Sequence, residues 1–386
     1  VILSYISLEV YTNFGILPNI MSYTTRKDLF EKIETHRSRP LIAYVTSIRP
    51  NFSGQMAGDS VDYIIKQIQS IPTTQREIDF LIISNGGDPI TALRIISLLR
   101  ERFDKISVLL PYVAYSAATI LSLGADEIIM HPYSNLGPVD PQLTVSRQSD
   151  NGQASQLQFS SEDIRNYIDF VKSDVGITDQ EHLISAFNAL AKEVGPLPIG
   201  SSKRSQQLSL SSSIKMLETH MEDKSKAAEI AKALNSSYYH HGYAVGRSEA
   251  KSIGLNIVFP DPELETLMWN VWCDYSNEMK CGSEFNIVTA IMTNPTVITW
   301  LNSATTINLP VNTPPPIAQN IIGNIAQQSA TITPQPPIQI KELVATIESP
   351  RSAMAIHTTF SITYWRDANM ALSFNATQYS EGWKIV

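Results

Sequence analysis

Apolar runs and amphipathic stretches alternate along the chain from residue 41 to residue 130. Continuous apolar runs, which are typical of strands buried on both faces, occur at 41–47, 78–84, 106–115 and 126–130. Between them, apolar residues recur with helical spacing at 59–71, 89–103 and 116–124. Strands that alternate with helices predict βαβ units, so we expect an α/β fold with a mostly parallel sheet.

The pattern changes on both sides of this region. Residues 1–38 are interpreted as a helical lead-in, and further helices are predicted at 160–173, 178–194, 203–221 and 223–237. Residues 285–340 contain no charged side chain and are rich in proline, which favours a linker or packing arm over a helical domain. Alternating apolar and polar residues then predict a small β-rich module. The expected domains are 1–38, 39–283 (the main α/β domain), 284–337 (the arm) and 338–386.

Composition narrows the possible classes of protein. With 386 residues, of which 43% are hydrophobic and 17% charged, the chain suits a soluble globular protein. A net charge of −8 gives no support to a nucleic-acid surface. No apolar stretch indicates a membrane span and the N-terminus lacks a basic leader, so a cytoplasmic location is expected. Cys273 and Cys281 match no disulfide framework or zinc pattern, and we expect buried free thiols, no metal and no cofactor.

Two of these predicted strands end in segments that could carry chemistry, at the edge where open α/β sheets usually bind ligands. In "NGGD", the amide of Gly87 could be an oxyanion-hole donor, or the glycines could only form a turn before a helix. Ser116 could be a nucleophile at a strand-to-helix turn, with the amide of Ala117 beside it. It could equally be an ordinary helix N-cap, which is a common role for serine.

The turn-rich segment "HPYSNLGPVDPQL" follows the next strand. Gly137 could pair with an extended peptide through its backbone, and Asp140 could either orient a base or stabilise the turn. His131 stands at a strand end before a proline, which favours a structural role. No single one of the three segments is decisive by itself.

Taken together, "SNGGD", "AYSAAT" and "SNLGPVDPQ" resemble the Clp/crotonase superfold of serine peptidases. The chain is most similar to the serine dehydrogenase proteinase family, close to the signal peptide peptidase A group. The resemblance covers residues 40–260, including "YYHHGYAVGRSEAKSIGL". It implies a Clp/crotonase-like spiral of βαβ units, Ser116 as nucleophile and a Gly-Gly oxyanion loop. It also implies a homo-oligomer that acts on peptides or unfolded proteins.

The resemblance leaves the general base open. Clp proteases use a Ser–His–Asp triad, but no histidine stands at the corresponding place after "HPYSNLG". Signal peptide peptidases use a Ser–Lys dyad, for which Lys203 in "IGSSKRS" is the matching lysine. Lysine acts as a base only where burial or a nearby cation lowers its pKa, and Arg204 could help or could bind a substrate carboxylate. Lys203 could also be a solvated loop cation, and Lys172 and His241 are further candidates.

Three functions follow from these residues. The first is a serine peptidase that works through an acyl-enzyme on Ser116. The second is an oligomeric scaffold on the same fold, with the C-terminal module as a possible protein-docking element. The third, a crotonase-like acyl-CoA enzyme, needs no serine at the helix start and so fits "YSAAT" poorly. Because an uncharged arm exposed to water favours aggregation, we expect residues 285–340 to pack between subunits.

Overall fold

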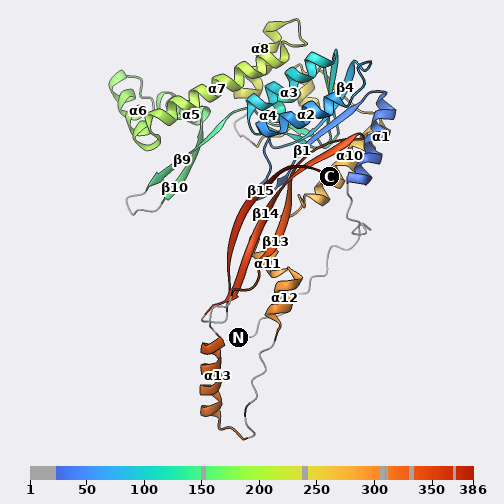
Figure 1. Ribbon diagram of the computed structural model, residues 1–386. Coiled ribbons are helices and arrows are strands. Elements are labelled where there is room, and N and C mark those ends of the chain that lie inside the picture. Colours follow the sequence, from blue (N-terminus) through green and yellow to red (C-terminus); the bar gives the residue numbers. More distant parts are fainter. Residues whose placement is uncertain are drawn as a thin grey trace.

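A computed structural model describes residues 23–148, 154–236, 242–303, 309, 312–329, 334–367 and 371–386 (Figure 1). Its centre is an eight-stranded sheet in the order β12-β7-β5-β4-β1-β13-β14-β15. The strands from β12 to β1 run parallel, and β13 to β15 continue the sheet antiparallel. Their bounds are β1 Leu41–Thr46, β4 Glu77–Ile83, β5 Lys105–Leu110, β7 Glu127–Met130, β12 Ile257–Val258, β13 Ile338–Ser349, β14 Ser352–Arg366 and β15 Leu372–Ile385. The predicted α/β class with a large, mostly parallel sheet is confirmed.

Helices cover both faces of the parallel strands. Along β1, Ile42 and Tyr44 join one apolar core while Leu41, Ala43 and Val45 join the other, which explains the continuous apolar run from Leu41 to Val45. The first core is closed by α2 Val61–Gln69, α3 Pro89–Arg102, α4 Ala117–Ser122, α7 Pro196–Leu217 and α8 Lys224–Ser236. The second is closed by α1 Tyr23–Arg37 and α10 Pro262–Glu278.

Short strands extend the carboxyl edge of the sheet. A three-stranded sheet is formed by β6 Val113–Ala114, β8 Asn135–Leu136 and β11 Val245–Gly246, and α9 Arg247–Ser252 follows β11. The predicted strand 106–115 is thus divided into β5 and β6, with a break at Pro111 and Tyr112. The hairpin β2 Ile48–Arg49 and β3 Phe52–Ser53 and the 3₁₀ turn η1 Gly58–Ser60 lie between β1 and α2.

An insertion between β8 and α8 projects from one side of the body (Figure 1). It consists of β9 Gln142–Gln148, β10 Ala154–Ser160, α5 Ser161–Ser173, α6 Gln180–Val194 and α7. The helix predicted to begin at 203 begins at Pro196, directly after Gly195, whose φ of +91° ends α6. Pro at the first helical position is a start signal, because its missing N–H would have no partner there.

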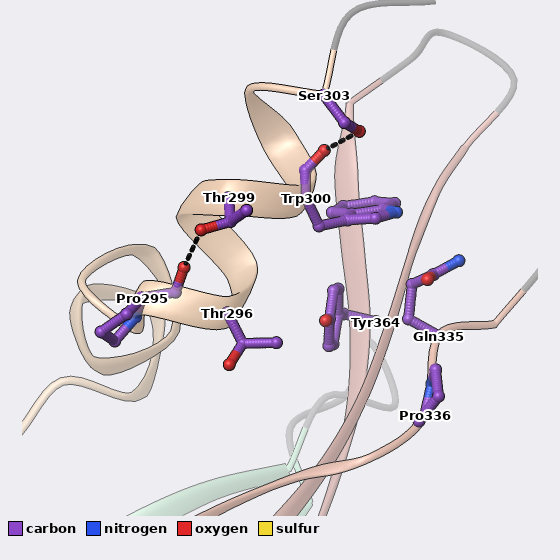
Figure 2. A pocket seen from close by; sticks show the side chains of 8 residues that line it. All are labelled: Pro295, Thr296, Thr299, Trp300, Ser303, Gln335, Pro336 and Tyr364. Atoms are coloured by element: carbon purple, nitrogen blue, oxygen red, sulfur yellow. Dashed lines mark hydrogen bonds between the residues drawn. The ribbon is translucent and has the colours of Figure 1, made fainter.

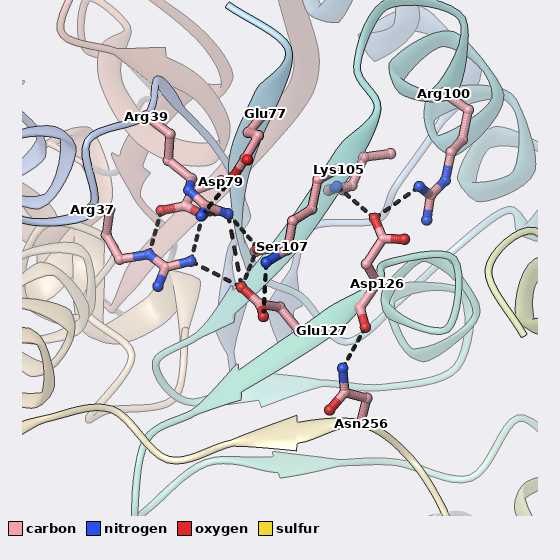
Figure 3. Close-up of polar contacts among 11 residues, drawn as sticks. Arg37, Arg39, Glu77, Asp79, Arg100, Lys105, Ser107, Asp126, Glu127 and Asn256 are labelled. Atoms are coloured by element: carbon pink, nitrogen blue, oxygen red, sulfur yellow. Dashed lines mark hydrogen bonds and ion pairs between the residues drawn. The ribbon is translucent and has the colours of Figure 1, made fainter.

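The amino ends of the parallel strands carry a network of charged side chains (Figure 3). Asp79 on β4, Ser107 on β5 and Glu127 on β7 lie opposite one another in register. Arg37 donates to Asp79 Oδ2 at 2.9 Å and to Glu127 Oε1 at 3.1 Å, and Arg39 donates to Ser107 Oγ at 2.9 Å. Burial raises the pKa of Asp79, which the two arginines oppose. Ligands usually bind at the opposite, carboxyl edge of such a sheet. The charges at the amino edge therefore have a structural role, and they bind the end of α1 to the sheet.

The C-terminal strands differ from the expected separate module. Four residues of β1, from Ala43 to Thr46, pair with β13, so residues 338–386 extend the main sheet instead of forming a sheet of their own. The residues of β1 are mostly apolar, but the edge that β4 leaves free carries backbone N–H and C=O groups. Pairing with β13 satisfies these groups. The predicted domain boundaries remain predictions.

The arm also differs from the expectation, because it contains α11 Ile287–Met292, α12 Pro295–Leu301 and α13 Pro315–Ser329. Asn286 caps α11 and Asn294 caps α12, with Pro295 in the first turn of α12. These residues are helix start signals as well as helix breakers. A third apolar cluster, with Ile291, Val297 and Phe360 among its buried members, packs α11 and α12 onto β14.

None of the helices in the described part of the chain is both long and apolar enough to cross a membrane. Cys273 and Cys281 are free and only partly buried, and burial raises the pKa of both thiols.

Candidate functional site

Ser116 occupies a strained turn between β6 and α4. Its φ of 51° and ψ of −117° lie in a region that non-glycine residues rarely adopt, at a typical cost of about 1–3 kcal/mol. The side chain makes no cap hydrogen bond to α4 and is only partly buried. The ordinary N-cap interpretation therefore does not explain this serine, whose hydroxyl has no hydrogen-bond partner among the residues that the structure describes.

The glycine loop after β4 packs directly against this turn. Gly86 has a φ of +102°, and a Cβ there would lie 2.5 Å from the Tyr115 carbonyl oxygen and 2.9 Å from Ser116 Cβ. At Gly87, with a φ of +146°, a Cβ would lie 2.3 Å from the carbonyl oxygen of Met56. Only glycine fits at both positions, so the two residues bring the loop backbone to Ser116.

The amide of Gly87 is directed away from its neighbouring strand. Met56 N donates to Gly86 O at 2.8 Å and Asp88 N donates to Met56 O at 2.9 Å, which is a parallel bridge centred on Gly87. In such a bridge the central residue turns its own N–H and C=O to the other side. Within the described residues, the amides of Gly87 and Ala117 donate no hydrogen bond. Both are available to a negatively charged oxygen near Ser116.

Ser116 and Gly87 line one pocket of about 320 Å³. The remaining walls come from the start of α3, from α4, from the loop before β9 and from α7. They are Asp88, Pro89, Ile120, Val139, Pro141, Gln142, Leu143, Ser205, Leu208 and Ser209. Most of these side chains are apolar or uncharged, and Asp88 is held as the cap of α3 by the amides of Ile90 and Thr91. The pocket can therefore hold an uncharged group beside the serine hydroxyl.

The sequence analysis did not single out the residues that α7 contributes to the pocket. Ser209 Oγ donates to the carbonyl oxygen of Val139 and fixes the helix over the loop. A signal was present, because buried serines recur along α7 at helical spacing: Ser202, Ser209, Ser212 and Ser213. A face of small hydroxyl side chains allows α7 to approach the loop closely.

The predicted lysine and arginine candidates lie outside this pocket. Lys203 and Arg204 are exposed on α7, within the helix and not before it. Successive residues of a helix are rotated by about 100°, so Lys203 lies almost opposite Ser205, which faces the pocket. Lys172 is exposed on α5, and His241 lies outside the described residues.

The crossover segment has a structural role. Gly137 N donates to Ala114 O at 2.9 Å and its carbonyl accepts from Thr119 Oγ1 at 2.9 Å. The amide of Gly137 is therefore not available to an oxyanion, whereas pairing of its carbonyl with a peptide stays a prediction, because a carbonyl oxygen can accept two hydrogen bonds. Asp140 is buried, accepts from Gln142 Nε2 at 3.3 Å and does not line the pocket.

His131 is also structural, as expected. It is 3% exposed, its Nδ1 accepts from Tyr133 N at 3.1 Å, and its ring stacks on Trp269. Burial lowers its pKa, which favours the neutral imidazole. The described residues contain no group of three or more His, Cys, Asp or Glu side chains placed to hold a metal ion.

A second pocket, of about 600 Å³, lies between α12 and β14 (Figure 2). The rings of Trp300 and Tyr364 meet edge to face there, with centroids 5.0 Å apart. Its other lining residues are Pro295, Thr296, Thr299, Ser303, Gln335 and Pro336. Because this set has no carboxylate, lysine or histidine, it offers no group for acid–base chemistry at neutral pH.

Residues 19–155 match the family model of the ClpP-like SDH-type serine proteinases. The matched range includes the glycine loop, Ser116 and the crossover segment. The resemblance drawn from the motifs is therefore confirmed over this range, and the mixed α/β fold is that of ClpP-like proteases.

Two uncharacterized proteins of Methanocaldococcus jannaschii are similar in sequence. One is 29% identical over 209 residues, which are 53% of this chain and 62% of that protein. The other is 36% identical over 80 residues, 21% of this chain and 27% of that protein. The matches thus span less than two thirds of these relatives.

Among solved structures, a mutant of the 1510-N membrane-bound stomatin-specific protease matches 58% of this chain and 82% of its own, at 16% identity and a TM-score of 0.32. That score is too low for the similarity to support an inference.

Proposed function

We propose that this chain is a serine peptidase in which Ser116 is the nucleophile. The observation that carries the proposal is a free serine hydroxyl, on a strained backbone, in a pocket that it shares with the unpaired amide of Gly87. The family match over residues 19–155 supports the same chemistry.

On this proposal, Ser116 Oγ attacks the carbonyl carbon of a peptide bond and loses its proton to a base. The amides of Gly87 and Ala117 hold the oxyanion of the tetrahedral intermediate. Collapse of the intermediate releases the amine, which takes up a proton, and leaves an ester on Ser116. Water then hydrolyses that ester by the same steps. An extended substrate pairs with the backbone of the Gly87 loop, and an uncharged side chain enters the pocket.

A fluorophosphonate probe tests this function directly, because it phosphonylates only an activated serine. The full chain is labelled and digested, and the modified residue is located by mass spectrometry. We expect the adduct on Ser116, and not on Ser205 or Ser209 of the same pocket. An absence of adduct at every protein concentration would support the scaffold alternative instead.

Lys203 remains the proposed base, in a Ser–Lys dyad with Ser116. This role requires α7 to change its orientation. In the described arrangement Lys203 faces away from the pocket, so the active state must rotate α7 and turn its lysine face toward Ser116. We expect Lys203→Met to slow labelling by about 100-fold or more, the usual contribution of a general base.

The matched control for this test is Lys172→Met, an exposed lysine on the neighbouring helix α5. It is expected to label at the wild-type rate. Equal rates for both variants would remove Lys203 from the mechanism and leave Ser116 in place, so the two parts of the proposal are tested separately.

A further inference from the structure

The central sheet ends in two very different edges. β12 closes one edge and is two residues long, which leaves little backbone for another strand to pair with. β15 closes the other edge and is fourteen residues long. Every second residue of such a strand directs its N–H and C=O away from its neighbour. β15 therefore presents a long row of backbone groups that no described strand of the chain pairs.

Residues 372–380 of β15 lack the features by which proteins usually protect an open edge. The segment has no charged side chain and no proline, and it pairs with β14 without a register shift. The protective features lie in the rest of the strand, with Glu381, Lys384 and a register shift opposite Trp383. The first nine residues of β15 are thus a regular, uncharged edge.

The side chains of this segment divide between the two faces of the sheet. Leu372, Phe374 and Ala376 pack against the cluster beneath α11 and α12. Asn375 and Thr377 are exposed on the other face. In Figure 1, β15 forms the outer margin of the three red strands, with no helix drawn along it. No described strand therefore pairs with the outer backbone edge of β15. One face of the strand packs on the cluster and the other is exposed.

We propose that residues 372–380 pair antiparallel with the same segment of a second copy, so that two eight-stranded sheets join across a two-fold axis. When a two-fold axis relates two antiparallel strands, residue i of one copy faces residue j of the other and j faces i, so one segment suffices for both sides of the interface. Pairing about Ala376 continues the apolar face of one sheet into that of the other.

The distribution of charge allows a second copy to pair at this edge. The chain carries a net charge of −8, so two copies repel each other overall. Residues 372–380 are uncharged, and so are residues 285–340, which supply the helices packed on the same strands. This part of the molecule is where two copies approach at the smallest electrostatic cost.

The test uses the charge of a single exposed side chain on the edge. With the pairing centred on Ala376, Thr377 faces Asn375 of the other copy and lies diagonally across from its Thr377. In Thr377→Lys and in Thr377→Glu, long side chains of like charge from the two copies then lie within reach of each other beside the centre of the pairing, which is destabilising. Light scattering of the full chain is expected to give half of the wild-type mass for each variant alone. An equimolar mixture of the two is expected to recover the wild-type mass, because a lysine then lies diagonally across from a glutamate.

Recovery in the mixture also shows that each variant is folded. The control is Ile298→Lys, an exposed residue of α12 on the arm, and its mass is expected to equal that of the wild type. A loss of mass in Ile298→Lys alone would assign the interface to the arm. A wild-type chain that is monomeric at all concentrations, or variants of unchanged mass, would overturn the proposal and leave the edge to a strand of another protein.

Discussion

Replacing Ser116 by alanine is expected to lower the rate of peptide hydrolysis by at least about 10⁴-fold. The nucleophile and its base act as one unit, so removing the hydroxyl abolishes the acyl-enzyme route and leaves only oxyanion stabilisation and substrate binding. The measurement is kcat/KM on an unstructured protein or a peptide library with apolar residues. KM is expected to change much less than kcat, because the hydroxyl contributes little to substrate binding.

The control for this prediction is Ser205→Ala, which removes a hydroxyl from the same pocket. Ser205 lies in the interior of α7, where backbone amides are used within the helix, so its loss is expected to change kcat/KM by only a few fold. If Ser205→Ala were the more damaging change, the nucleophile would have to be assigned to α7. If both variants retained full activity, the hydrolysis would belong to a contaminant.

Replacing Arg26 by methionine is expected to lower the free energy of unfolding by about 3–5 kcal/mol. Arg26 is 1% exposed and binds acids from two elements, Asp274 and Glu278 on α10 and Glu348 on β13. Burial alone would lower the pKa of Arg26, but the hydrogen bonds to Glu348, together with the charge interactions with Tyr275, Glu348 and Glu278, raise it above its ordinary value. Methionine would fill similar space and leave the carboxylates without their cation. Chemical denaturation at neutral pH measures the loss.

The destabilisation of Arg26→Met is expected to shrink at low pH. Burial raises the pKa of Asp274 and of Glu278, and Arg26 opposes both shifts, so its removal raises them further. A carboxyl with a raised pKa in the folded state favours folding at low pH and loses that contribution as pH rises through the folded pKa. The deficit should therefore be smaller at pH 5 than at pH 8.

The matched control is Arg76→Met. Arg76 also binds a carboxylate, that of Asp104, but both side chains are more than half exposed. Its loss is expected to leave stability nearly unchanged at either pH, since exposed pairs contribute little. Equal losses of stability in Arg26→Met and Arg76→Met would show that the buried ion pairs of Arg26 do not hold α1 to the sheet.

The sequence predicted the parts of the fold that depend on local pattern. Continuous apolar runs identified β1, β4, β5 and β7, because strands buried on both faces are apolar at most positions. Alternation identified β13 to β15 as strands. The glycine pair and the lone serine are each ordinary at a strand end, and they became informative because they occur together with the crossover segment.

Where the sequence predictions differed from the structure, the deciding contacts were distant ones. The pairing of β13 with β1 joins residues about 300 positions apart in the chain, and no local pattern specifies that pairing. The capping asparagines and first-turn prolines of the arm were interpreted as helix breakers, although they also start α11 and α12. The helix predicted to begin at Lys203 begins at Pro196, because packing of α7 overrides the poor helix propensity of Gly200, Ser201 and Ser202.

The sequence by itself determined the α/β class and placed Ser116 and Gly87, the centre of the proposed site, at strand ends on the carboxyl edge, because strand burial and glycine turns are encoded in neighbouring residues. Only the tertiary structure decided that Gly137 is internally bonded, that α7 covers the pocket, and that the sheet ends in an open β15. Each of these depends on which strand edge or helix face meets another across the chain, and such meetings are set by packing and not by local spacing.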